Sequence, residues 1–84
     1  MKAEEIANRI EIYHRVTNNS YKIGLNTNES VVGYFVQAND YEELKAKNIW
    51  RVVKIPNILK WKATSNPEHS ELLNGDLIVS ISVV

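Results

Sequence analysis

The fold is decided by the stretch from Tyr21 to Val36, which reads YKIGLNTNESVVGYFV. Apolar side chains alternate with small or polar ones in its first part, the turn formers of residues 27–30 follow, and an apolar run begins at Val31. This pattern predicts an antiparallel β-hairpin. Gly33 lies inside the second predicted strand, where a glycine indicates a sharp bend or the close approach of another backbone.

A helix is predicted before the hairpin, over residues 3–17. Its apolar residues recur with helical spacing and form one stripe: Ile6, Ile10, Tyr13 and Val16. Glu4 and Glu5 lie in its first turn, which the helix dipole favours. The turn formers Thr17-Asn18-Asn19-Ser20 end it.

After the hairpin, short apolar segments predict further strands. They are Ile49–Ile55, ended by Pro56; Ile58–Ala63, in which Leu59, Trp61 and Ala63 alternate with lysines; and Leu77–Val84, entered through Leu72-Leu73 and Asn74-Gly75-Asp76. The segments 39–48 and 64–70 read as polar connections. The sequence predicts one α+β domain over residues 1–84, mainly β: the N-terminal helix and a small, strongly bent five-stranded antiparallel barrel over about residues 20–84.

The composition limits what kind of protein this is. A chain of 84 residues fits one domain. It contains no Cys, which excludes disulfides and thiolate metal sites. No apolar run reaches the roughly 18 residues of a membrane span, and the first residues are too polar for a signal peptide. We therefore expect a cytoplasmic or otherwise intracellular protein that does not insert into membranes.

The net charge of +0 hides a separation of charge along the chain. Between residues 45 and 62 the chain has six basic residues and no acidic one: Lys45, Lys47, Arg51, Lys54, Lys60 and Lys62. Both tryptophans, Trp50 and Trp61, lie in the same segment. The segment reads either as two strands with solvated lysines or as a basic surface for an anionic partner.

The C-terminal run Leu77–Val84 has no charge, no proline and high β-propensity. An open edge of this kind would promote aggregation, so another strand must cover it. Pairing with a second subunit would hide the edge and enlarge a small core, whereas pairing inside its own barrel is the alternative.

Two stretches resemble the motifs of the Sm and Sm-like (LSm) proteins. The run from Leu73 to Ser82 is similar to the second motif, a hydrophobic residue followed by Arg-Gly, a polar residue and a strand. Ile23-Gly24-Leu25, Val32-Gly33-Tyr34-Phe35 and Asn39-Asp40-Tyr41 are similar to the first motif, in which a bent strand leads to an Asp-containing loop. The order of helix, hairpin, variable segment and last strand also agrees.

The resemblance implies a homo-oligomeric ring of five to seven subunits, joined by strand pairing and free of cofactors and catalysis. It implies that single-stranded RNA is bound at loops containing Asn39, Asp40, Tyr41, Asn74 and Gly75. Flat side chains and positive charge suit such a ligand. Asn74, however, stands where the family has the arginine that sandwiches the base. The alternative is therefore a protein-interaction or scaffold module in which Trp50, Trp61 and the basic strands meet an acidic protein.

No residue pattern predicts an enzyme. His14 and His69 are the only histidines, and they lack the spacing of a metal site. Neither an activated nucleophile nor a phosphate-binding glycine loop is recognisable in the sequence. We expect a binding protein without a metal ion.

Overall fold

The structure is a computed structural model that describes residues 1–16 and 20–83, with the backbone alone described for residues 12–16. Its helices and strands, in chain order, are α1 (Ala3–Val16), β1 (Tyr21–Leu25), β2 (Ser30–Phe35), α2 (Tyr41–Ala46), β3 (Ile49–Lys54), α3 (Ile58–Thr64), β4 (Glu71–Asn74) and β5 (Ile78–Val83). Short 3₁₀ turns lie at Ile55–Asn57, Pro67–His69 and Gly75–Leu77.

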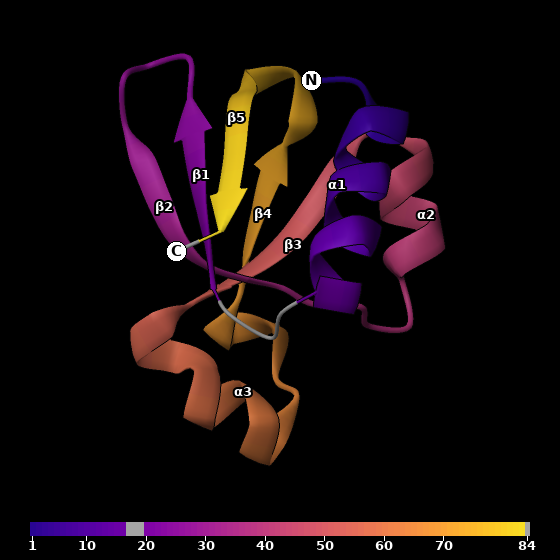
Figure 1. Ribbon diagram of the computed structural model, residues 1–84. Coiled ribbons are helices and arrows are strands. Elements are labelled where there is room, and N and C mark those ends of the chain that lie inside the picture. Colours follow the sequence, from indigo (N-terminus) through magenta and orange to yellow (C-terminus); the bar gives the residue numbers. More distant parts are fainter. Residues whose placement is uncertain (17–19, 84) are drawn as a thin grey trace.

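The strands form one antiparallel five-stranded sheet in the order β4-β3-β2-β1-β5 (Figure 1). The predicted α+β fold, an N-terminal helix followed by a bent five-stranded antiparallel sheet, is confirmed. Within the described residues no ladder joins β4 to β5. The sheet is therefore not closed into a barrel, and β4 and β5 are its two edges.

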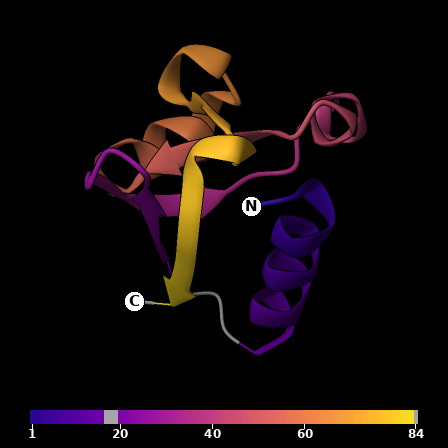
Figure 2. The same ribbon diagram turned by 90° about the horizontal axis from the view of Figure 1, so that it is seen from above.

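The core lies between α1 and the sheet, and Figure 2 shows α1 running alongside the strands. Buried side chains come from the helix and from three strands, β1, β3 and β5: Ile6, Ile10, Tyr21, Ile23, Trp50, Val52, Ile78 and Ile81. Burial of a large aliphatic side chain such as Ile6 contributes roughly 1.5–3 kcal/mol. Ile6 and Ile10 confirm the first half of the predicted stripe. The side chains of Tyr13 and Val16, and the predicted turn at residues 17–19, lie outside the described residues.

The backbone of β3 approaches that of β2 closely at Gly33. Gly33 pairs with Lys54, and a β-carbon at position 33 would collide with the carbonyl oxygen of Val53. The expectation of a close backbone approach at this glycine is confirmed. Only hydrogen fits there.

A bulge in β5 changes which of its side chains face the core. Leu25 pairs with Ile78 and Gly24 with Ser80, which leaves Val79 without an opposite residue. Because the extra residue shifts the alternation, Ile78 and Ile81 are both buried although they are three positions apart. Val79 is 59% exposed as a result.

The predicted strand at Ile58–Ala63 is wrong, because this segment forms α3. Leu, Lys, Trp and Ala are all accepted in helices, and a segment of this length is too short for its periodicity to decide. The turn containing Pro56 precedes the helix. Ser65 ends the helix in the left-handed conformation, with its N–H donating to the carbonyl of Trp61 at 2.7 Å.

The polar connection predicted between β2 and β3 contains a second short helix, α2. Glu42 and Glu43 lie in its first turn and Lys45 in its last, the arrangement that the helix dipole favours. Glu43 also pairs with Lys47, four residues on, at 3.7 Å. No helix of the described chain has the length and apolar character needed to cross a membrane.

Candidate functional site

Asn74 and Gly75, predicted from the second motif, close the turn between β4 and β5. The side-chain oxygen of Asn74 accepts from the N–H of Asp76 at 2.9 Å. The N–H of Gly75 donates to the carbonyl of Asn48 at 2.7 Å, and a β-carbon at Gly75 would collide with the Asn48 amide. These two residues thus serve the packing of the turn against the start of β3.

Asn48 connects this turn to the core, a role that the sequence did not reveal. Its Oδ1 accepts from Trp50 Nε1 at 2.8 Å. Its Nδ2 donates to the Met1 carbonyl at 3.0 Å and to Asp76 Oδ1 at 3.2 Å. The backbone of Asn48 is left-handed, with φ of 56°. Asn is one of the residues favoured in the left-handed position that follows a helix. The sequence signal for this role was therefore an Asn placed directly after residues 41–47, which are able to form a helix.

Tyr41, which the resemblance predicts to stack on a base, is half-buried against the core. Its ring meets that of Trp50 edge to face, with centroids 6.0 Å apart. Burial raises the pKa of Tyr41 above its ordinary value of 10.0, and the nearby negative charges of Glu42 and Glu11 raise it further. Tyr41 also borders a hollow of about 320 Å³ between α1 and α2.

Asp40 is held by an ion pair with Arg51 of β3. Arg51 Nη2 lies 2.6 Å from Asp40 Oδ2, and Nη1 donates to Ser70 Oγ at 2.8 Å. The Arg51 side chain is only 11% exposed, whereas that of Asp40 is 39% exposed. Asp40 Oδ1 and Arg51 Nε are buried and have no hydrogen-bond partner. Arg51 therefore links α2, β3 and the start of β4 rather than presenting a free cation.

A second hollow, of about 280 Å³, lies where α3 meets the connection before α2. Its apolar lining comes from Trp61, Pro67 and Ala38. Its polar lining comes from Asn39 and Ser65, together with Asp40 and Arg51 of the ion pair. We call this site the Trp61 hollow.

The structure distributes the five predicted RNA-binding residues over three places. Asn39 and Asp40 line the Trp61 hollow, Tyr41 packs on Trp50, and Asn74 and Gly75 form the β4–β5 turn. Sequence reasoning missed the contribution of α3 to the hollow, because the Ile58–Ala63 segment was interpreted as a strand.

The six residues of the predicted basic surface have different environments. Three form ion pairs: Lys47 with Glu43, Arg51 with Asp40, and Lys54 with Glu71 at 3.1 Å. Of the ion pairs among described residues, none involves Lys45, Lys60 or Lys62. Lys60 and Lys62 flank Trp61 on α3, which projects beyond one end of the sheet (Figure 1). The free positive charge is therefore concentrated on α3 more than on the strands.

Both edges of the sheet expose aliphatic side chains. Leu72 on β4 is 52% exposed, and Val79 and Val83 on β5 are 59% and 37% exposed. Within the described part of the sheet β4 pairs only with β3 and β5 only with β1, so no strand covers the other side of either. On β5 the carbonyls of Ile78 and Ile81 accept hydrogen bonds from the Met1 amino group at 2.7 Å and from Arg9 Nη1 at 3.3 Å. Such edges are able to receive a further strand.

Among the described residues no three His, Cys, Asp or Glu side chains are grouped so that they could hold a metal ion. Comparisons with protein-family models, curated proteins and solved structures gave no match for this chain.

Proposed function

We propose that this protein is a non-catalytic, Sm-like module that assembles with copies of itself by pairing β4 of one subunit with β5 of the next. The observation that supports this most directly is the sheet order, which leaves these two different strands as open edges. A strand added to either edge would pair those of its N–H and C=O groups that have no partner within the chain, and it would bury the exposed aliphatic side chains. At β5 it would replace the contacts that Met1 and Arg9 make with the carbonyls of Ile78 and Ile81. Because the two edges differ, the contact is heterologous and leads to a ring or to a filament.

Light scattering coupled to size exclusion tests the assembly. We expect a discrete species several times heavier than the 9.6 kDa chain. Val79→Lys and Leu72→Lys should each shift this species toward the monomer, because a lysine on an edge opposes strand addition. Leu59→Lys is the matched control: Leu59 is 77% exposed on α3, outside the two edge strands, and its replacement should leave the mass unchanged. A wild-type protein that remains monomeric at every concentration would contradict the proposal.

A second candidate function is the binding of single-stranded RNA. It is favoured by Trp61, which α3 presents between Lys60 and Lys62, because single-strand binders combine flat side chains with positive charge. The same arrangement suits an acidic protein, but the part of that alternative that relied on Trp50 is wrong, since Trp50 is 2% exposed.

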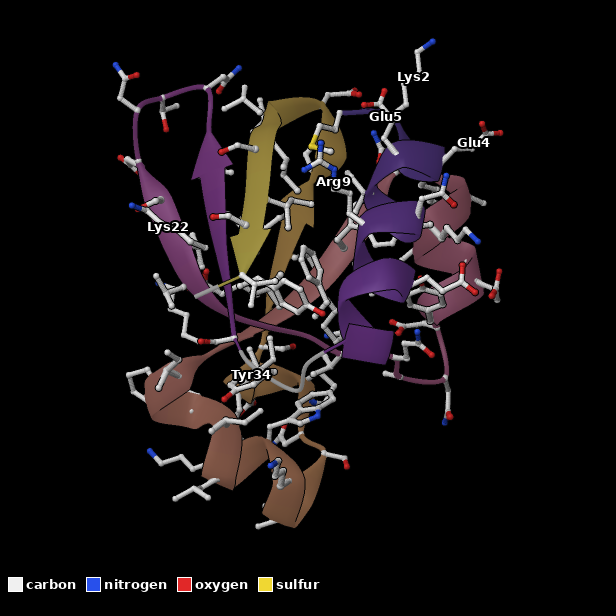
Figure 3. The ribbon with its side chains drawn as sticks, viewed as in Figure 1. Lys2, Glu4, Glu5, Arg9, Lys22 and Tyr34 are labelled. Atoms are coloured by element: carbon white, nitrogen blue, oxygen red, sulfur yellow. The ribbon has the colours of Figure 1, made fainter. Side chains whose placement is uncertain are left out.

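Fluorescence anisotropy with labelled RNA at rising salt distinguishes these ligands. We expect affinity to fall between about 50 and 200 mM salt, and the double variant Lys60→Ala, Lys62→Ala to lower the salt slope by roughly 0.7 for each lysine. Lys22→Ala is the control, because Lys22 is an exposed lysine of β1 whose side chain lies beside the hairpin (Figure 3). Absence of binding at low salt would exclude RNA.

A further inference from the structure

The Trp61 hollow combines three features that together point to one class of ligand. It has an apolar wall, a polar lining from an ion pair, and two lysines next to its tryptophan in the sequence. The wall comes from α3, the following turn and Ala38, the polar lining from the Asp40–Arg51 pair, and the lysines from the positions on either side of Trp61 in α3.

The wall suits a planar ring. The indole of Trp61, together with Pro67 and Ala38, provides an apolar lining to a hollow of about 280 Å³. This volume lies just below the range of roughly 300–1,000 Å³ that is usual for small-molecule sites. A ligand of one ring system fits it better than a larger molecule.

Asp40 and Arg51 line the hollow and hold a hydrogen-bond acceptor and a donor beneath its surface. Asp40 Oδ1 and Arg51 Nε are buried and lack partners although their neighbouring atoms form a 2.6 Å ion pair, so a ligand reaches them when these side chains turn. Unsatisfied buried polar atoms are rare in folded proteins and call for a partner. Because the Asp40 side chain is 39% exposed, its carboxylate is able to turn toward a ligand without opening the core. Nucleobase edges carry an acceptor beside a donor, which complements this pair.

The two lysines beside Trp61 in α3 carry charge of the sign that a phosphate requires. Lys60 and Lys62 are exposed, adjoin Trp61 in sequence, and have no ion pair among those of the described residues. Figure 3 shows Glu4 and Glu5 at the end of α1 that lies away from α3, so these two carboxylates do not neutralise the α3 lysines. A phosphate attached to a base in the hollow would meet this pair of cations.

We propose, building on the RNA binding suggested above, that the Trp61 hollow is a nucleotide site: the base stacks on Trp61 with its polar edge toward Asp40 and Arg51, and the phosphate lies at Lys60 and Lys62. The ligand is either a free mononucleotide or one unit of an RNA single strand. The site lies between α3, the turn that follows it, Arg51 of β3 and residues 38–40, and its lining does not include Tyr41 or the β4–β5 turn.

Tryptophan fluorescence of the full chain tests the site, because the chain has two tryptophans and Trp50 is buried in the core. The probes are AMP, inorganic phosphate and oligoadenylate of about eight nucleotides. We expect AMP or oligoadenylate to quench the emission of the wild-type protein and of Lys22→Ala. The variants Trp61→Leu and Trp61→Phe lack the reporter, so their binding is measured by the anisotropy of labelled oligoadenylate. Trp61→Leu should weaken binding about 5- to 150-fold, and Trp61→Phe, which keeps a flat ring, should weaken it less.

The outcomes separate the two sources of the ligand and the two proposals. Quenching by AMP indicates a free-nucleotide site, whereas quenching by oligoadenylate alone indicates a unit of a single strand. RNA binding that Trp61→Leu leaves unchanged overturns the site while RNA binding stands. Phosphate competing as well as AMP overturns the nucleotide site in favour of a simple anion site. Binding of neither AMP nor oligoadenylate also overturns the nucleotide site, and if labelled RNA fails to bind at low salt as well, RNA binding is excluded with it. The double variant Lys60→Ala, Lys62→Ala, which keeps the ring, gives a second test should Trp61→Leu fail to fold.

Discussion

At the scale of single residues, Asn48 shows how one amide joins distant parts of the chain. The side-chain nitrogen of Asn48 donates to Met1 and Asp76, and its side-chain oxygen accepts from the Trp50 indole. Its carbonyl receives the N–H of Gly75. An aspartate in the same place would keep the acceptor but lose the donor to Met1.

Two replacements of Asn48 should lower the free energy of unfolding by different amounts. The comparison separates the contribution of the Asn48 side chain from that of its backbone conformation. Asn48→Gly removes the side-chain hydrogen bonds and should lower the free energy of unfolding by about 1–3 kcal/mol, because Trp50 Nε1 loses its acceptor. Asn48→Ala also places a β-carbon in the left-handed region, which should cost up to about 1 kcal/mol more. Urea unfolding measures both.

Asn28 provides the control for this pair of variants. It has a similar φ of 68°, but it lies in the exposed turn between β1 and β2. Asn28→Gly should change the free energy of unfolding by less than about 0.5 kcal/mol. An Asn48→Gly variant as stable as Asn28→Gly would show that the Asn48 hydrogen bonds contribute nothing.

Tyr41 should make stability fall at high pH. Its pKa is raised in the folded state, so the unfolded chain loses its proton first as the pH rises past 10.0. The stability linked to this group is present in full below that value and is lost as the pH rises through the folded pKa. Tyr41→Phe keeps the ring beside Trp50 and removes the ionisable group.

The measurement is urea unfolding of wild type and Tyr41→Phe from about pH 9 to about pH 11. The free energy of unfolding of the wild type should decrease relative to that of the variant across this range. A difference between the two proteins that does not change with pH would show that the Tyr41 hydroxyl is not shielded in the folded state.

At the scale of elements, the segment between β3 and β4 contains a short helix, α3, which projects beyond one end of the sheet (Figure 1). α3 has seven residues, begins after a proline-containing turn and ends at Ser65 in the left-handed conformation. Isolated helices this short are unstable in water, so α3 depends on its ends and on the contacts of Trp61. It carries two lysines that have no ion pair among those of the described residues, and it forms one wall of the Trp61 hollow.

Ser65→Gly should stabilise the protein by about 0.5–1 kcal/mol, because glycine adopts the left-handed conformation without a steric penalty. Ser30→Gly is the matched control in β2, where glycine only adds entropy to the unfolded chain and should lower stability by roughly 0.5–1 kcal/mol. Thermal unfolding compares the two variants with wild type. A loss of stability in Ser65→Gly would mean that the serine side chain matters more than the backbone at this helix end.

At the scale of the whole molecule, the open sheet and the small size of the chain support self-association. A short chain buries a smaller fraction of its surface than a larger domain, and here both edges of the sheet expose aliphatic side chains. Pairing between copies would enlarge the core without adding sequence.

Thermal stability should therefore depend on protein concentration. If folding and assembly are linked, the midpoint of unfolding rises with concentration by mass action, and a roughly 100-fold range of concentration should reveal it. Val79→Lys should remove this dependence, whereas Leu59→Lys should preserve it. If the midpoint of the wild type does not depend on concentration, folding is not linked to assembly.

Much of the fold follows from local sequence patterns. The helix stripe of Ile6 and Ile10, the hairpin of β1 and β2, and the close approach at Gly33 were all predicted from spacing and residue type. These features depend on neighbours within a few positions or on a property that only glycine has. Each of these features can therefore be predicted from the short segment of sequence that forms it.

Tertiary structure decided the rest, because the same short segments are compatible with more than one conformation. The alternation at residues 58–63 fits a strand or a helix, and only the absence of a ladder partner and the turns at its ends select α3. Trp50 and Arg51 belong to the basic segment in sequence, yet packing buries the first and pairs the second with Asp40. The sequence by itself determined the order of the first helix and the hairpin and the separation of charge. Which of those charges and rings remain available to a ligand depends on long-range contacts that no local pattern encodes.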